Sequence, residues 1–316
     1  MVEGNDLNEP IYGLTRLDPF FRGFVKTSRQ QHEKTRVAKS FLLTYLGIER
    51  NYDIFIENYY EFECAMNEAT TRSMIYRSYD FNSFQNTINT FNRTISNVIA
   101  SGRAYVDMTK KSISTLSKID DVISLDYILE LKSIYEASIG YRVMDALRNY
   151  SLHHEFPVHY LTLGSEWIGD ETDEKLRFSI SPYVQTERLL RDKNFKRSVA
   201  KELSNIGDKI ELKYLVRDYV EHISNFHFFI RDGLTDRIIQ HEINYCDMHN
   251  IYGSHFPNTE HSAPLASVLQ ECPSQYADVI EIQKEFSDYR RYFFSKHKKL
   301  TNLKCRYISS EVIDKG

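Results

Sequence analysis

The chain has few of the residues that punctuate short elements of structure. Its 316 residues include only 12 Gly, 7 Pro, 4 Cys and 1 Trp. Scarce Gly and Pro argue against many short strands joined by tight turns, and they favour long helices. The cysteines are far apart and form no CxxC pair, so we expect reduced thiols rather than disulfides; they are Cys64, Cys246, Cys272 and Cys305.

Several functional signatures are missing as well. Neither GxGxxG nor GxxxxGK[ST] occurs, so no phosphate-binding loop and no cofactor is expected. No apolar run approaches the ~20 residues of a membrane span, and the first ten residues do not resemble a signal peptide. We therefore expect a cytoplasmic protein with no membrane partner. The formal net charge of −4 means that any nucleic-acid binding must come from a local basic patch.

Apolar residues at spacings of three and four predict long amphipathic helices. The clearest begins at Asp80, a helix-capping residue type, and has Phe84, Ile88, Phe91 and Ile95 on one face. A capping box at 208–211 predicts the start of another, which we expect to bend near Gly233. The predicted helices cover about 33–46, 52–77, 80–116, 124–153, 208–250 and 279–298.

Between the helices, residues 157–185 are rich in β-branched and aromatic side chains around a polar turn, which predicts a β-hairpin. The expected fold is mainly α, an array of long antiparallel helices with this hairpin inserted. We expect an irregular segment at 1–30 and one helical domain at 31–252. Residues 253–316 should form a loop and a basic, aromatic helix that packs on the same domain.

The most informative segment lies where the 124–153 helix should end. Arg148, Asn149, His153 and His154 crowd its last turn, and Pro157 follows. A guanidinium can hold a phosphate, and an imidazole can move a proton near neutral pH. These four residues are the predicted catalytic group.

The run from Arg148 through Asn149 to His153 resembles the motif of the HEPN superfamily, in which Arg is followed by a polar residue and then by His at the end of a long helix. The resemblance implies a HEPN-like helical domain, often a homodimer with facing motifs. It also implies a metal-independent endoribonuclease of a toxin or antiphage defence system, restrained by an antitoxin or a larger complex. A degenerate member would instead be a non-catalytic scaffold.

On this interpretation RNA is the substrate. His153 would exchange a proton with the ribose 2′-hydroxyl, and Arg148 would stabilise the phosphoryl oxygens as negative charge develops. Asn149 would hold the substrate or orient the imidazole, and His154 is a spare acid or base. The products would carry 2′,3′-cyclic phosphate and 5′-hydroxyl ends.

Other interpretations of the motif stay open. The same spacing joins Arg217 to His222, and Arg290 or Arg291 to His297. Residues five apart on an ideal helix point about 140° apart, so Arg148 and His153 converge only if the helix frays or a second subunit completes the site. Alternatively, Asp145 pairs with Arg142 or Arg148, and the histidines only cap the helix.

Two basic segments are predicted to contact nucleic acid. One lies at 188–201 and the other, with interleaved aromatics, at 284–306. The cations predicted to bind are Arg188, Arg191, Lys196, Arg197, Arg290, Arg291, Lys298 and Lys299. Alternatively, both segments are solvent-exposed helix faces that do not contact nucleic acid.

The segment 241–261 holds residue types that bind zinc, among them His241, Cys246, His255 and His261. No familiar ligand spacing emerges, so no metal site is predicted. A metal-dependent hydrolase that uses these histidines is the weakest of the alternatives.

Overall fold

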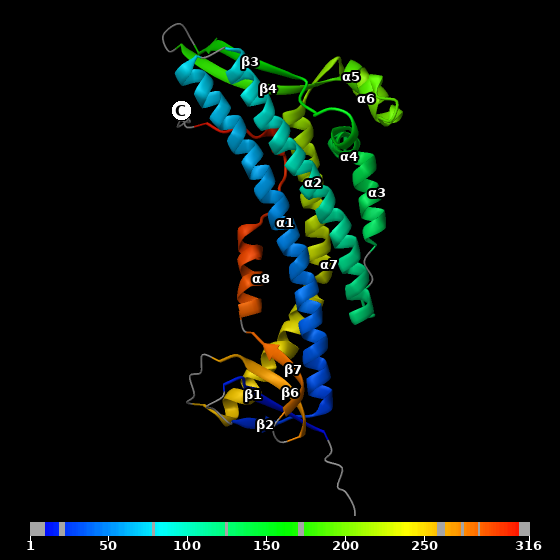
Figure 1. Ribbon diagram of the computed structural model, residues 1–316, viewed down its shortest axis with the longest axis vertical. Coiled ribbons are helices and arrows are strands. Elements are labelled where there is room, and N and C mark those ends of the chain that lie inside the picture. Colours follow the sequence, from blue (N-terminus) through cyan, green and yellow to red (C-terminus); the bar gives the residue numbers. More distant parts are fainter. Residues whose placement is uncertain are drawn as a thin grey trace, which may run out of the picture. The chain divides into compact units, whose positions relative to one another are not determined.

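The computed structural model is mainly α, and Figure 1 shows its helices and strands. It describes residues 10–18, 23–77, 80–123, 126–169, 174–257, 263–272, 275–283 and 285–309. The three longest helices are α1 (Arg29–Tyr76), α2 (Phe81–Ile119) and α7 (Leu212–His255). The shorter ones are α3 (Tyr127–Ala137), α4 (Ile139–His153), α5 (Thr186–Arg191), α6 (Arg197–Ile206), α8 (Glu285–Lys296) and the 3₁₀ turn η1 (Leu303–Cys305). None of the helices described is both long and apolar enough to cross a membrane.

Two antiparallel sheets accompany the helices. The first has the order β2-β1-β6-β7 and comprises β1 (Ile11–Arg16), β2 (Phe24–Lys26), β6 (Leu265–Cys272) and β7 (Gln275–Ile282). The second has the order β3-β4-β5 and comprises β3 (Tyr160–Ile168), β4 (Lys175–Gln185) and β5 (Lys209–Glu211). The predicted hairpin at 157–185 is confirmed as β3 and β4, which pair from Tyr160 with Tyr183 to Ile168 with Lys175.

The chain divides into two compact units. Unit 1 comprises Met1–Glu49, Lys111–Leu125 and Arg231–Lys298, and holds the first sheet. Unit 2 comprises Arg50–Lys110, Asp126–Ile230 and Lys299–Gly316, and holds the second sheet together with the predicted catalytic residues. Residues of α1, α2 and α7 contribute to both units.

Several predicted boundaries differ from those observed. The helices expected at 33–46 and 52–77 form one helix, α1, because Leu46, Ile48 and Tyr52 continue its buried face through the intervening residues. The expected 124–153 helix is instead two. Ser138 interrupts it because its hydroxyl accepts a bond from the Tyr141 N–H at 2.9 Å and donates to the Asp218 carboxylate. The helix break is therefore set by a contact with α7, far away in sequence.

The strands of the first sheet were not predicted. Residues 11–16 and 24–26 lie in the segment expected to be irregular, and 265–272 in the expected loop. Pro264 directly precedes β6, a position at which proline does not interrupt the ladder. The prediction of a capping box at 208–211 was wrong, since Lys209–Glu211 is strand β5 and α7 begins at Leu212. Helix α7 continues past Gly233, and α8 begins only at Glu285 because 279–282 belong to β7.

A buried ion pair holds α1 against α7 within unit 1. Arg231 donates from Nε and Nη2 to the two carboxylate oxygens of Glu49, at 3.0 and 2.6 Å. The Glu49 and Arg231 side chains are 0% and 5% exposed. Tyr45 also donates to Glu49, and burial together with this carboxylate raises the pKa of Tyr45 well above its usual range. Because both charges have left water, each depends on the other for compensation.

We expect Arg231→Met to lower the free energy of unfolding by ~3–5 kcal/mol, since it leaves the Glu49 carboxylate buried without its partner. Adding Glu49→Gln should restore most of the loss, because the amide is neutral and still accepts from Tyr45. Urea unfolding followed by circular dichroism measures both effects. Arg291→Met is the control, because its ion pair with Asp288 is exposed, and it should cost ~1 kcal/mol or less. If Arg231→Met were as stable as Arg291→Met, the buried ion pair would not have the importance assigned to it.

Candidate functional site at the end of helix α4

Helix α4 presents the predicted residues at its C-terminal end, within unit 2. Its buried stripe includes Val143, Leu147 and Tyr150, which turns neighbouring positions toward solvent. Arg148 is therefore half-buried, whereas Asn149, His153 and His154 are exposed. The helix persists through His153, and His154 leaves it with φ −137° and ψ −80°. Asn149 and His153 share a face, while Arg148 and His153 of one chain point about 140° apart.

Arg148, Asn149 and His153 have free side chains. None of the three makes a hydrogen bond or ion pair with a described residue. His154 packs its ring against Tyr150, with centroids 5.1 Å apart. The cluster is thus available to a ligand rather than used within the fold.

The pairing that the alternative interpretation expected is not the one observed. Asp145 accepts from Arg103 of α2, at 3.1 Å. Arg142 binds the carboxylate of Glu202 and the carbonyl of Tyr135. Arg148 is consequently the one buried or half-buried arginine of the described part of the chain that has no carboxylate or carbonyl partner. Burial raises the pKa of Tyr219 well above its usual range, and the positive charge of Arg148 opposes that rise.

A polar network around His159, next to the cluster, was not predicted from the sequence. The buried His159 ring accepts the Gln185 N–H at Nδ1 (3.1 Å) and contacts the Tyr150 hydroxyl from Nε2 (3.3 Å). Tyr150 in turn donates to Glu155 at 3.1 Å, and Arg188 donates to the other oxygen of that carboxylate at 2.6 Å. These bonds fasten the loop after α4 to strand β4. The Tyr150 position within an apolar stripe gave no signal of this polar role.

His159 is the stabilising histidine of this loop rather than its proton carrier. Burial lowers its pKa to about 4, although Glu155 favours the charged form. Because Nδ1 accepts a backbone N–H, the neutral ring carries its proton on Nε2. An imidazole held neutral in this way cannot serve as an acid near neutral pH, so any acid–base role falls to the exposed His153 or His154.

The second Arg–His spacing is occupied by internal contacts. Arg217 forms a two-bond ion pair with Glu63, at 2.7 and 2.8 Å, and donates to the carbonyl of Arg306 at 2.6 Å. His222 donates from Nδ1 to the Asp218 carbonyl at 2.8 Å. Arg217 thus holds α7 to its neighbours in unit 2, and His222 bonds within α7 itself, which leaves no open phosphate site there.

Four of the eight cations predicted to bind nucleic acid are paired with carboxylates. At 188–201, Arg188 and Arg191 pair with glutamates, and Lys196 lies 4.6 Å from the ring centre of Tyr135. Arg197 is exposed and makes no ion pair with a described residue. In the C-terminal segment the paired cations are Arg290 with Glu242 and Arg291 with Asp288, whereas Lys298 and Lys299 are exposed and form no such pair.

The third Arg–His spacing does not assemble an open pair either. Arg290 contacts both oxygens of Glu242, at 2.6 and 2.7 Å, and lies over the Phe294 ring. His297 is buried and stacks on Phe293. Neither side chain is presented to a ligand in common.

The histidines described between 241 and 257 do not converge on a metal site. His241 contacts Asp120 at 3.1 Å and stacks on Phe41, and Cys246 faces Ser287. Over the described ranges no three His, Cys, Asp or Glu side chains come together as ligands. His261 falls outside those ranges. The metal-dependent alternative gains no support from this geometry.

Unit 1 contains an arrangement that looks like a hydrolase triad. His32 Nδ1 lies 2.8 Å from the Ser267 hydroxyl, and its Nε2 lies 2.7 Å from the Asp278 carboxylate, which Arg36 also binds. Ser267 is 1% exposed on β6, between β1 and β7, so a substrate carbonyl cannot reach it. A nucleophilic serine must be accessible, and this group instead fixes the start of α1 to the sheet.

Comparison with known proteins adds no assignment: no family model matches the chain, and no curated protein or solved structure is significantly similar to it. The HEPN resemblance therefore rests on the motif at the end of α4.

His159 should make unit 2 sensitive to acid. The unfolded chain binds a proton at this residue near pH ~6.5, whereas the folded protein does so only at about 4, so stability is fully present above ~6.5 and falls as the pH drops toward 4. His159→Asn keeps an acceptor for Gln185 without titrating. Between pH 7 and 4.5, the free energy of unfolding of this variant should fall by ~2 kcal/mol less than that of wild type.

Trp167, the only tryptophan, lies on β3 and reports the unfolding of this unit by fluorescence during urea titration. His154→Asn, a change in an exposed neighbour, should follow the wild-type pH curve. Parallel curves for wild type and His159→Asn would contradict the assignment.

Proposed function

We propose that the protein is a metal-independent endoribonuclease whose site lies at the C-terminal end of α4. The observation that carries the proposal is Arg148, a half-buried guanidinium without an anionic partner, one residue from exposed Asn149 and near exposed His153. Elsewhere in unit 2 the half-buried arginines Arg103, Arg142 and Arg188 are each paired with a carboxylate. A partly desolvated guanidinium binds phosphate strongly through paired donors.

The proposed reaction needs no metal or cofactor. A base removes the proton of a ribose 2′-hydroxyl, whose oxygen attacks the adjacent phosphorus while the bond to the 5′-oxygen breaks. A general acid then protonates that leaving oxygen. His153 of one copy supplies one of these groups, and His154 supplies the other. Arg148 stabilises the charge that develops on the phosphoryl oxygens.

A homodimer is part of the proposal. Within one chain Arg148 and His153 point in different directions along α4, so a phosphate bound by one is out of reach of the other. Two copies that meet at their α4 ends would place the arginine of one beside the histidine of its partner. This arrangement is the one that the HEPN resemblance implies, and it would suit a toxin or antiphage effector held in check by an antitoxin or a larger complex.

The first test is cleavage of total cellular RNA in EDTA by the purified protein. We expect products with 2′,3′-cyclic phosphate and 5′-hydroxyl ends, and no cleavage of DNA, which lacks the 2′-hydroxyl. Arg148→Ala and His153→Ala should each lower the rate at least ~100-fold. Arg93→Ala is the matched control, because Arg93 is exposed on α2 and has no described partner. Its rate should equal that of wild type.

Mixing the two inactive variants tests whether the site is shared between subunits. In a symmetric dimer with composite sites, exchange of subunits should restore about a quarter of wild-type activity, since half of the dimers are mixed and each has one intact site. No recovery, with dimers confirmed by light scattering, would contradict the shared site. Full activity in both single variants would exclude this site, whereas no cleavage by the wild-type protein would leave the non-catalytic interaction protein as the better explanation.

A further inference from the structure

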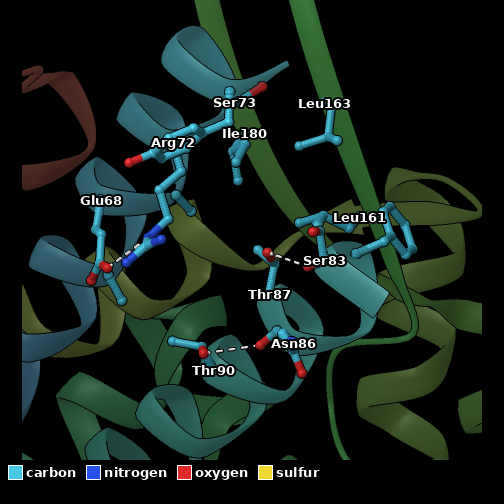
Figure 2. A pocket seen from close by; sticks show the side chains of 14 residues that line it. Glu68, Arg72, Ser73, Ser83, Asn86, Thr87, Thr90, Leu161, Leu163 and Ile180 are labelled. Atoms are coloured by element: carbon cyan, nitrogen blue, oxygen red, sulfur yellow. Dashed lines mark hydrogen bonds and ion pairs between the residues drawn. The ribbon is translucent and has the colours of Figure 1, made fainter. Parts of the chain in front are cut away.

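Unit 2 contains a second candidate site, distinct from the end of α4. A half-open cavity of about 450 Å³ lies between α1, α2 and the β3–β4 hairpin. Its size is within the range of pockets that bind small organic molecules, ~300–1,000 Å³. Figure 2 shows the side chains that line it. None of them belongs to the proposed ribonuclease site.

The cavity arises from a change of side-chain size along two helices. Nearby in unit 2, Phe62 and Met66 of α1 and Phe91 and Ile95 of α2 are buried and fill the core. Toward the α1–α2 connection, several of the residues that line the cavity are small, although Tyr76 and Phe84 also line it. The small ones are Ala65, Ala69, Ser73, Ser83, Thr87 and Thr90.

One wall of the cavity is apolar. Side chains alternate along a strand, and Leu161 and Leu163 of β3, with Ile180 opposite Leu163 on β4, present one face of the hairpin to it. Trp167 lies on the same face farther along β3 and is 66% exposed. In Figure 2 Leu161 and Leu163 lie to the right of the space, and the Glu68–Arg72 pair lies to the left.

The polar side is rich in donors that lack an acceptor. Arg72 binds Glu68 through Nε at 2.8 Å, which leaves its two Nη groups without a described partner. The Ser73 hydroxyl and the Asn86 amide also line the cavity and make no side-chain bond to a described residue. The hydroxyls of Thr87 and Thr90 already donate to helix carbonyls at 2.9 Å. A ligand here therefore meets unpaired donors, which suit an anionic head group.

We infer that this cavity binds a small amphipathic carboxylate, with its apolar body on Leu161, Leu163 and Ile180 and its carboxylate at Arg72, Ser73 and Asn86. The inference does not depend on ribonuclease activity. Arg72 can bind the carboxylate of the ligand because its contact with Glu68 uses only Nε and leaves both Nη groups as donors. Binding energy comes chiefly from burial of the apolar body, and the head group sets the orientation.

The probes are 8-anilinonaphthalene-1-sulfonate, an aromatic anion, and decanoate as its competitor. We expect saturable binding of one dye per chain, displaced by decanoate more strongly than by decan-1-ol. Excitation of Trp167 should produce dye emission by energy transfer, and Trp167→Phe should remove that emission while the directly excited signal remains. Dye that binds without energy transfer from Trp167, or that decanoate does not displace, would place the site elsewhere and overturn the inference.

Two variants test separately whether ligands occupy the cavity and whether its polar side binds the carboxylate. Ala69→Leu fills the cavity and should weaken dye and decanoate binding at least ~10-fold, whereas Ala104→Leu, the same change at an exposed position of α2, should have no effect. Arg72→Gln should weaken decanoate roughly three- to fivefold and leave decan-1-ol unchanged, with Arg93→Gln as its control. Unchanged affinity in Ala69→Leu would overturn the site, and equal losses for acid and alcohol in Arg72→Gln would overturn the carboxylate as its ligand class.

Discussion

Ion pairs between α1 and α7 constrain the rest of each unit. In unit 1 the pair is Glu49 with Arg231, and in unit 2 it is Glu63 with Arg217. The two glutamates are as far apart along the sequence of α1 as the two arginines are along that of α7. Charges removed from water cannot slide past one another without losing compensation, so these pairs fix the register of the helices more strictly than interchangeable apolar contacts can.

That register decides which polar residues stay free. Asp218, next to Arg217 on α7, accepts bonds from Ser138 and from the N–H of Gly140, and so sets where α4 begins. Helix α4 then turns Tyr150 inward toward the His159 network and leaves Arg148 half-buried. Arg103 of α2 binds Asp145 of α4, and Arg142 of α4 binds Glu202 of α6, so that Arg148 remains the half-buried arginine without a described partner. The proposed site thus consists of polar residues that have no ion-pair partner among the described residues.

Polar groups recur in this fold in positions where a motif search would assign chemistry. The His32–Ser267–Asp278 group has the residue types of a hydrolase, and Arg217 with His222 has the spacing of the ribonuclease motif. Burial and internal hydrogen bonds distinguish both from a working site, because their donors and acceptors are already used. The cavity beside α1 and α2 shows the opposite case: its residues form no recognisable motif, yet Arg72, Ser73 and Asn86 present unused donors.

Local periodicity and turn residues encode the mainly helical class, the β3–β4 hairpin and the crowding of Arg148, Asn149, His153 and His154 at a helix end, so these features could be predicted from the sequence. It did not reveal the first sheet, whose strand β1 at residues 11–16 pairs with β6 at 265–272, since such pairing depends on distant partners. The break at Ser138 and the choice of Asp145 to pair with Arg103 were likewise decided only by tertiary contacts. Availability of a side chain depends on every neighbour that competes for it, and no local pattern records those neighbours.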